Sequence, residues 1–353
     1  MRRHRLSLLL IGIAFSLVVA ACGDSGEDTT TTTAAPGTTG AETTTTTTEA
    51  PMGDRIRVAY VPVNDAAPLF WAENLGMYED AGLDVELVSV PSGEAVNAAI
   101  ASGDVDIGVT STVPILAAYN AGFPLRIVTG LSTNVPEGPQ DSGGAIMSMA
   151  DSGIDTVAAI CEVDNPRASA GAPGSLARGY FRAALRMNGC DPDTVEYIPM
   201  PPADAGAALL NGDIHVVYHG EPAVTDTLAK GGQVLSWTFR EVTGPSTPIA
   251  YMVANQSWAE EHADDIRALQ DVWSEAIDMW ADEANRDQFL DILVEWAAYA
   301  PPRDVLEQIQ IATLTMCMDI ESLRRVERMM VDERLLPAET RPLEDLVFET
   351  ATC

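Results

Sequence analysis

Basic residues are scarce in this chain. Its 353 residues include 20 Lys and Arg against 52 Asp and Glu, the formal net charge is −32 at pH 7, and Lys230 is the only lysine. Proteins bind nucleic acids and anionic lipids largely by neutralising phosphates with Lys and Arg. The composition therefore excludes nucleic acid as an expected partner and predicts a strongly acidic, well-solvated surface.

Long apolar runs are also missing beyond the N-terminal region. A basic start is followed by an apolar run that ends in Val19-Ala20-Ala21-Cys22, which is the layout of an export signal. The run is shorter than the roughly 20 residues that a bilayer span needs. Val-Ala-Ala-Cys resembles a bacterial lipobox, so we predict a signal peptide over 1–21 and a lipid on Cys22. The alternative is an ordinary secretory signal with a chance cysteine.

Apolar residues are sparse in the next segment, 22–53, which consists mostly of Thr with Ala, Gly, Pro, Asp and Glu. Such a segment buries too little apolar surface to offset the entropy of ordering it. We predict a disordered linker that holds a folded body away from the membrane. Removal of the signal also removes three arginines, so the charge of the mature chain is about −35.

Cysteines are few, but four of them follow Cys22, an even number in an oxidising compartment. Three pairings of these four are open. We favour Cys161 with Cys190 and Cys317 with Cys353, because each pair closes a short local loop.

The folded body alternates β-rich and helical patterns, which predicts an α/β fold with mostly parallel sheets flanked by helices. Its length exceeds one ordinary domain. We predict a first lobe over 54–132 that is completed by the C-terminal part 249–353, a hinge over 133–144 and a second lobe over 145–248. The predicted strands are 56–62, 84–90, 105–109, 125–129, 156–161, 195–199, 214–218, 233–237 and 249–254, with helices between them, including one over 66–81.

An internal repeat connects the two lobes. AIASGDVDIGV at 99–109 aligns without gaps with ALLNGDIHVVY at 208–218, an offset of 109 residues. In both copies a helix ends in Gly-Asp and leads directly into an apolar strand, and His215 takes the position of Asp106. Beyond the repeat, Ser257 and Glu260 have the spacing of a capping box. A stripe of Trp and aliphatic residues follows them at helical spacing, which predicts a long helix packed on the core.

No catalytic or metal motif stands out. His215 and His219 are four apart on a predicted strand, which separates their Cα atoms by roughly 13 Å, too far for one zinc ion. The sequence has no G-x-S-x-G, H-E-x-x-H or P-loop pattern. We therefore predict no catalytic residue, no metal and no cofactor.

Small polar residues follow several predicted strands, where the carboxyl ends of parallel strands and helix N-termini form ligand sites. We predict a binding cleft there. Trp71 and Tyr218 are candidates for stacking on a ligand, and Asp65 and Glu221 are candidates for accepting hydrogen bonds from it. The full candidate set is Asn64, Asp65, Trp71, Ser92, Thr110, Ser111, Thr112, Ser175, Tyr218, His219 and Glu221.

Several motifs resemble the bacterial ABC-importer substrate-binding proteins that take up aliphatic sulfonates, nitrate and thiamine precursors. The supporting residues are Leu69 to Ala72, Gly76 to Glu86, Pro91 to Gly93, Ser102 to Gly108, Ala121 to Leu125, Gly174-Ser175, Ala208 to Asp213 and Glu221-Pro222. The resemblance covers about 55–240 and implies a type II periplasmic-binding fold whose two lobes close on a ligand and then dock on a permease. The chain departs from the family pattern at His215, where an acid is common, and in Cys161 to Gly171, which lacks a Lys-Gly-Lys strand entry.

Together these features predict a monomeric, membrane-anchored, extracytoplasmic receptor that delivers a small solute to an ABC permease and ATPase. Few basic residues lie in the candidate loops, which argues against arginine forks around a strongly anionic ligand. The candidate ligands are a heterocycle such as an amino-pyrimidine, or a sulfonate-like or nitrate-like solute. Two alternatives stay open: an enzyme on the same fold acting on a pyrimidine or menaquinone precursor, and a surface sensor that works without a transporter.

Overall fold

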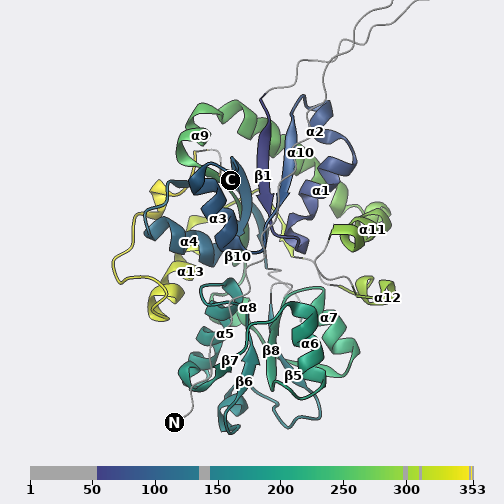
Figure 1. Ribbon diagram of the computed structural model, residues 1–353, viewed down its shortest axis with the longest axis vertical. Helices are drawn as coiled ribbons and strands as arrows, with labels where there is room; N and C mark the ends of the chain where they lie inside the picture. The colour runs from purple at the N-terminus through teal and green to yellow at the C-terminus, as the bar shows by residue number, and fades with distance from the viewer. Residues whose placement is uncertain (1–53, 135–143, 297–300, 310–311, 350, 352–353) are drawn as a thin grey trace, which may run out of the picture. The chain divides into compact units, whose positions relative to one another are not determined.

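The structure of the chain is a computed structural model (Figure 1). It describes residues 54–134, 144–296, 301–309, 312–349 and 351, and for Asn64 and Trp296 the backbone alone. The predicted signal peptide, Cys22 and the linker lie outside the described residues, as does most of the predicted hinge. Residues 50–353 belong to one compact unit, within which two separate sheets form the two lobes.

The first sheet has six strands in the order β11-β4-β10-β3-β1-β2. Strand β1 pairs in parallel with β2 and β3, whereas β10 is inserted antiparallel between β3 and β4. A strand from far along the chain therefore returns to complete this sheet. The strands are β1 (Ile56–Tyr60), β2 (Val85–Ser89), β3 (Ile107–Ser111), β4 (Leu125–Thr133), β10 (Pro248–Asn255) and β11 (Thr313–Leu314).

The second sheet has five strands in the order β7-β6-β8-β5-β9. Strand β6 is parallel to β7 and β8, and β5 runs antiparallel to both of its neighbours. Each sheet thus combines a parallel core with an antiparallel strand. The strands are β5 (Ala145–Met149), β6 (Arg167–Ser169), β7 (Glu196–Tyr197), β8 (Val216–His219) and β9 (Gly232–Trp237).

Helices flank both sheets (Figure 1). Helices α4, α8 and α9 begin directly after a strand end, whereas α3, α5 and α7 begin after the loops that follow β2, β6 and β8. The helices are α1 (Ala67–Asn74), α2 (Met77–Asp80), α3 (Gly93–Ser102), α4 (Thr112–Asn120), α5 (Leu176–Met187), α6 (Pro202–Leu210), α7 (Ala223–Ala229), α8 (Thr238–Val242), α9 (Gln256–Glu261), α10 (Ala263–Ala281), α11 (Arg286–Trp296), α12 (Arg303–Leu306) and α13 (Ile320–Asp332).

Three sequence predictions of local structure are wrong. The predicted strand at 156–161 is instead a 3-10 helix, Ala158–Glu162, and the strands of this region are β5 and β6. The predicted helix over 66–81 is interrupted at Gly76, whose φ of 71° lies in the left-handed region that glycine tolerates. The long helix does not open with a capping box at Ser257, because the side chain of Asn255 caps α9 and accepts a hydrogen bond from the Ser257 amide.

The aromatic stripe on α10 lies in the core, as its helical spacing predicts. Ile266, Leu269 and Trp273 are fully buried, and the Trp273 indole N–H donates a hydrogen bond of 2.9 Å to the hydroxyl of Tyr78. This helix packs on α1 against one face of the first sheet. None of the described helices combines the length and the apolar character that crossing a bilayer would require.

The two crossovers between the sheets are joined to each other. The backbone N–H of Asn134, just after β4, donates to the carbonyl of Thr247, just before β10. The Asn134 side chain in turn accepts a hydrogen bond from the amide of Thr247, and both residues are buried. The point at which the chain passes between the sheets is therefore a paired double crossover.

A disulfide joins Cys161 to Cys190, with 5.8 Å between their Cα atoms, which is the predicted pairing. It links the 3-10 helix Ala158–Glu162 to the residues that follow α5. Cys317 is also disulfide-bonded, but Cys353 lies outside the described residues, so that second pairing stays a prediction.

Candidate functional site

A cavity of about 340 Å³ lies between the strand ends of the two sheets. The segment after β1, the strands β3 and β10 and the N-termini of α3 and α4 contribute from the first sheet. The second sheet contributes the start of α5 and the end of β8. Seven candidates from the sequence line this cavity, namely Asp65, Ser92, Thr110, Ser111, Ser175, Tyr218 and Glu221.

Asp65 lies in the short 3-10 helix Asn64–Ala66 that follows β1. Burial raises the pKa of its carboxyl group, and the Ser132 hydroxyl opposes this effect only in part. No ion pair joins Asp65 to an Arg or Lys in the described part of the chain. The carboxylate is thus desolvated without a cationic partner there. The side chain of its neighbour Asn64 lies outside the described residues.

Glu221 follows β8 in the second sheet. Its carboxylate accepts two hydrogen bonds from Thr225, one from the backbone amide at 3.1 Å and one from the hydroxyl at 2.9 Å. These contacts fix the carboxylate over the first turn of α7 while it faces the cavity. Each carboxylate oxygen can accept more than one hydrogen bond, so the group can still contact a ligand.

The hydroxyl candidates are partly engaged in local contacts. The Ser92 hydroxyl caps α3 by accepting from the Ala95 amide, and the Ser175 hydroxyl caps α5 by accepting from the Arg178 amide. The Thr110 hydroxyl donates to the carbonyl of Gly93. Capping holds α3 and α5 in place at opposite sides of the cavity. Tyr218 is largely buried, and its hydroxyl accepts from Thr238.

The sequence prediction missed most of the apolar wall and one acid. Glu94 follows Ser92 by two residues, and a β-carbon placed on Gly174 of the second lobe would lie 3.8 Å from its carboxylate. Its place in the first turn of α3, the helix that follows β2, was the available signal. The missed apolar residues are Val61, Val63, Val109, Pro114, Leu176, Ala177, Ile249, Ala250 and Ala312, and no sequence signal marked them.

Three predicted ligand-binding residues do not line the cavity. Trp71 lies in the core beside α11, with its ring 5.1 Å from that of Phe289 in an edge-on contact. Helical phase explains the error, because α1 turns this side chain toward the core. Thr112 is fully buried, and its hydroxyl donates to the carbonyl of Pro248.

His219, the third of these, is also buried. Its Nδ1 lies 3.0 Å from the Thr227 hydroxyl, which places the ring between β8 and α7 and away from the cavity. Burial lowers the pKa of His219 to about 4. On a strand, adjacent side chains point to opposite sides, so Tyr218 and His219 cannot both face the cavity.

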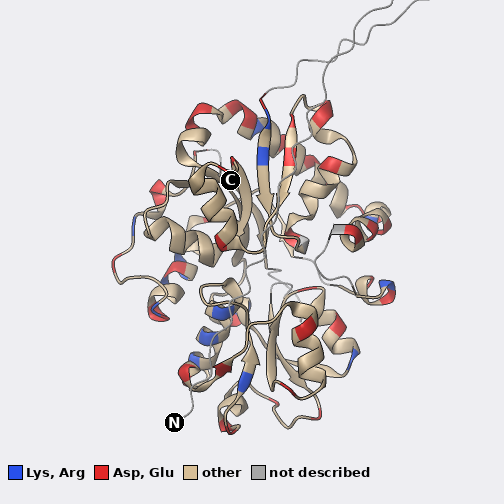
Figure 2. Ribbon diagram, viewed as in Figure 1, with Lys and Arg blue, Asp and Glu red and all other residues tan. Residues whose placement is uncertain are grey.

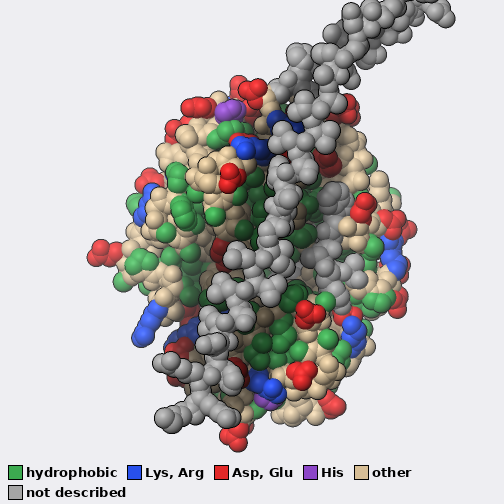
Figure 3. Space-filling view, in the orientation of Figure 1, with side chains coloured by type: hydrophobic (Ala, Val, Ile, Leu, Met, Phe, Trp, Pro, Cys, Tyr) green, Lys and Arg blue, Asp and Glu red, His purple; other side chains and the backbone are tan. Residues whose placement is uncertain are grey.

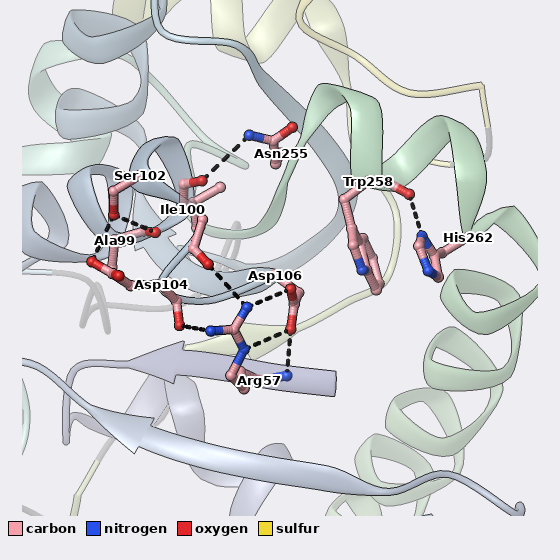
Figure 4. A network of polar contacts seen from close by, with 10 residues as sticks. Arg57, Ala99, Ile100, Ser102, Asp104, Asp106, Asn255, Trp258 and His262 are labelled. Carbon is pink, nitrogen blue, oxygen red and sulfur yellow. Dashed lines mark hydrogen bonds and ion pairs between the residues drawn. The ribbon is translucent and has the colours of Figure 1, made fainter. Parts of the chain in front are cut away.

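The repeat extends to the individual contacts. Figure 4 shows the Arg57 side chain of β1 bound to Asp106 and to backbone carbonyls at the end of α3. The Asp106 carboxylate also accepts from the Arg57 amide at 2.8 Å. In the second lobe, Nδ1 of His215 accepts from the Arg167 amide at 2.9 Å, and the Arg167 guanidinium donates to the Gly212 carbonyl. His215 therefore accepts the backbone hydrogen bond that Asp106 accepts in the first lobe, and it does not line the cavity.

Metal-binding side chains are dispersed in the described part of the chain. No group of three or more His, Cys, Asp or Glu side chains within it is arranged to hold a metal ion. The chemistry that the cavity offers is hydrogen-bond acceptance by carboxylates and hydroxyls, together with apolar contact.

Two proteins of known name are similar to this chain in sequence. The taurine-binding periplasmic protein of Escherichia coli is 25% identical over 214 residues, which cover 61% of this chain and 62% of that protein. The nitrate import ATP-binding protein NrtC of Synechococcus elongatus is 24% identical over 250 residues, covering 67% of this chain and 37% of that protein. The chain thus spans less than two thirds of the length of either relative.

The fold has solved counterparts. The crystal structure of the periplasmic aliphatic sulphonate binding protein SsuA from Escherichia coli superposes with a TM-score of 0.68 at 19% identity, covering 85% of this chain and 94% of that one. Both are α/β structures with the two-lobed periplasmic-binding architecture. The sequence pattern of the NMT1-like family matches residues 49–294, more than half of the chain. The chain belongs to the NMT1-like family.

Proposed function

We propose that this protein is an extracytoplasmic solute-binding lipoprotein that captures a small molecule between its two lobes and delivers it to an ABC importer. The observation that carries the proposal is the cavity of about 340 Å³, which is lined from both sheets at their strand ends. The relatives named for taurine binding and nitrate import support it.

The anchor belongs to the proposal. Cleavage before Cys22 and acylation of that cysteine would attach the protein to the outer face of the cell membrane. The Thr-rich segment 22–53 would then act as a tether that lets the folded part reach the permease. The protein would work as a monomer bound to its permease and ATPase partners.

Ligand capture would involve movement of the lobes about their crossovers. In this proposal the first lobe comprises 54–132 and 249–353, the second comprises 145–248, and 133–144 is part of the hinge. The bonds between Asn134 and Thr247 support a shared pivot, because they join the two chain crossings. Closure would enclose the ligand between Asp65 on one side and Glu221 on the other.

The carboxylates suggest the chemistry of the ligand. Asp65 and Glu221 are suited to a molecule that presents N–H donors, such as an amino-substituted heterocycle. Tyr218 adds an aromatic surface to the cavity wall. A sulfonate-like or nitrate-like solute, as the names of the relatives suggest, would have to be held by backbone amides and hydroxyls instead.

Glu221→Ala tests the site. We first identify the copurifying solute by native mass spectrometry and then measure its affinity by calorimetry. Removal of the carboxylate should weaken binding about tenfold or more, because a charge-assisted hydrogen bond is lost. His215→Ala is the control, because His215 precedes β8 while Glu221 follows it, and His215 does not line the cavity. Unchanged affinity in Glu221→Ala would remove the proposed role of this loop.

The same preparation distinguishes a receptor from an enzyme. Incubation of the purified protein with the bound solute should return the solute unchanged. Formation of a product would favour the enzyme alternative. A sensor would be favoured if the protein binds the solute stably but cells that lack the permease and ATPase take up the solute as fast as cells that have them.

A further inference from the structure

We propose that the solute bound between the lobes is an organic cation, a protonated amine with an apolar body. This inference rests on the proposed function, since it specifies the ligand class of that same cavity. It departs from the anionic solutes in the names of the related proteins.

The charges on the cavity wall all have one sign. Asp65, Glu94 and Glu221 line it, and no Arg or Lys does so among the described residues. Asp65 and Glu94 come from the first lobe and Glu221 from the second, so a ligand between the lobes meets carboxylates on both sides. A sulfonate or nitrate in the same place would experience repulsion from all three groups.

Arg178, in the first turn of α5, is directed away from the cavity by its contacts. The Arg178 guanidinium donates to the carbonyls of Ala170 and Gly171, and it stacks 3.9 Å over the ring of Tyr197. Its side chain is buried in these contacts. Arg178 therefore supplies no anion-binding fork to the cavity, although it belongs to the first turn of a helix that borders it.

Helix N-termini can attract an anion, but at three of those that border the cavity, on α3, α5 and α7, a side chain of the protein already accepts from a backbone amide; the cap of α4, Ser111, makes no such bond. The Ser92 hydroxyl accepts from the Ala95 amide on α3, and the Ser175 hydroxyl accepts from the Arg178 amide on α5. On α7 the Glu221 carboxylate accepts from the Thr225 amide. A carboxylate of the protein thus occupies a position where an anionic ligand would gain its hydrogen bonds.

The rest of the wall determines what kind of cation fits. Nine aliphatic or proline side chains surround the carboxylates, so an apolar body gains by leaving water. A bare metal ion would gain nothing from such a wall, and the described residues hold no cluster of three or more metal-binding side chains. An ammonium group beside Asp65 would offset the cost of burying that carboxylate.

The net charge of the whole chain has the same sign as the charged side chains that line the cavity. With 52 acidic residues against 20 basic ones, its field attracts cations and repels anions. Figure 2 shows acidic residues distributed over the elements of both lobes. Acidic side chains also lie around the apolar areas on the face drawn in Figure 3. A cleft in such a surface concentrates positively charged solutes.

Matched ligand triplets test the inference with the full-length protein in detergent. Each triplet shares one aliphatic, alicyclic or aromatic body and carries an ammonium, a hydroxyl or a sulfonate head group. Thermal-shift hits, followed by calorimetry, should be confined to the ammonium members, and the solute that copurifies in native mass spectrometry should be a cation. A sulfonate that binds as tightly as its ammonium counterpart, or a copurifying anion, overturns the inference but leaves the receptor function standing. Absence of any bound or binding solute overturns the receptor function itself.

Variants that replace one carboxylate with a neutral amide test which acidic residues bind the ammonium group. Asp65→Asn and Glu221→Gln should each weaken binding of an ammonium hit about tenfold or more, since each removes one charge-assisted contact. Asp213→Asn removes the same unit of charge at the exposed turn before β8 and should change the affinity less than about twofold. Equal effects of all three variants would show that only the overall field acts and would overturn the assignment of a cation site.

Discussion

At the scale of single residues, two histidines four positions apart have different environments. His215 is half-buried and accepts from the Arg167 amide, which requires a neutral ring nitrogen. His219 is buried between β8 and α7. Burial lowers the pKa of both rings. The internal repeat aligns His215 with Asp106, and the two residues accept corresponding backbone hydrogen bonds, whereas His219, a predicted ligand-binding residue, does not line the cavity.

The shifted pKa of His219 predicts a pH-dependent stability. Because its folded-state pKa of about 4 lies below the ordinary value near 6.5, the unfolded chain binds the proton first. The contribution is fully present above about pH 6.5 and is lost as the pH falls toward 4, up to about 3 kcal/mol. Urea unfolding of the protein and of His219→Gln at several pH values measures it. The variant should lose this part of the slope, and identical slopes would contradict the prediction.

At the scale of elements, α10 shows how a periodic pattern translates into packing. Its apolar positions recur at helical spacing, and these residues form a buried face against α1 and the first sheet. Trp258 belongs to the same sequence stripe but lies on α9, which His262 separates from α10. The rings of Trp258 and His262 stack with their centroids 4.6 Å apart. The stripe thus predicted burial correctly but not the break in the helix.

Substitution of a fully buried and a half-buried tryptophan compares their contributions to the free energy of unfolding. Trp273→Phe removes the hydrogen bond to Tyr78 and leaves unfilled volume in a fully buried site. The free energy of unfolding should fall by about 2 kcal/mol or more. Trp258→Phe, the control at a half-buried site, should lower it by less than about 1 kcal/mol. Chemical denaturation measures both, and equal losses would show that α10 does not anchor the core as described.

At the scale of the whole molecule, the acidic excess dominates the electrostatics. A formal charge of −32 repels itself in the compact state. Several arginines relieve this locally; Arg182 and Arg186 of α5 both contact Glu333, just after α13. These pairs join the second lobe to the C-terminal part of the chain.

Salt screens the repulsion between the acidic side chains, so a higher ionic strength should stabilise the fold. Raising KCl from 10 to 200 mM shortens the Debye length from about 30 Å to below 10 Å. We expect Tm to rise by a few degrees in calorimetry at pH 7.5, whereas sucrose at equal osmolality controls for non-ionic effects. A Tm that falls with salt would mean that favourable ion pairs outweigh the repulsion.

The α/β class, the repeat between the lobes and the loops that carry Asp65, Ser92 and Glu221 could be predicted from the amino-acid sequence. These features follow from local periodicity and from the rule that parallel strand ends collect ligand sites. Which of the neighbouring side chains face the cavity could not be predicted in the same way. Tyr218 lines it while His219 is buried, and Trp71 packs in the core while Glu94 faces the opposite lobe. The physical reason is that the facing of a side chain depends on strand register and helix phase, which packing between distant segments sets.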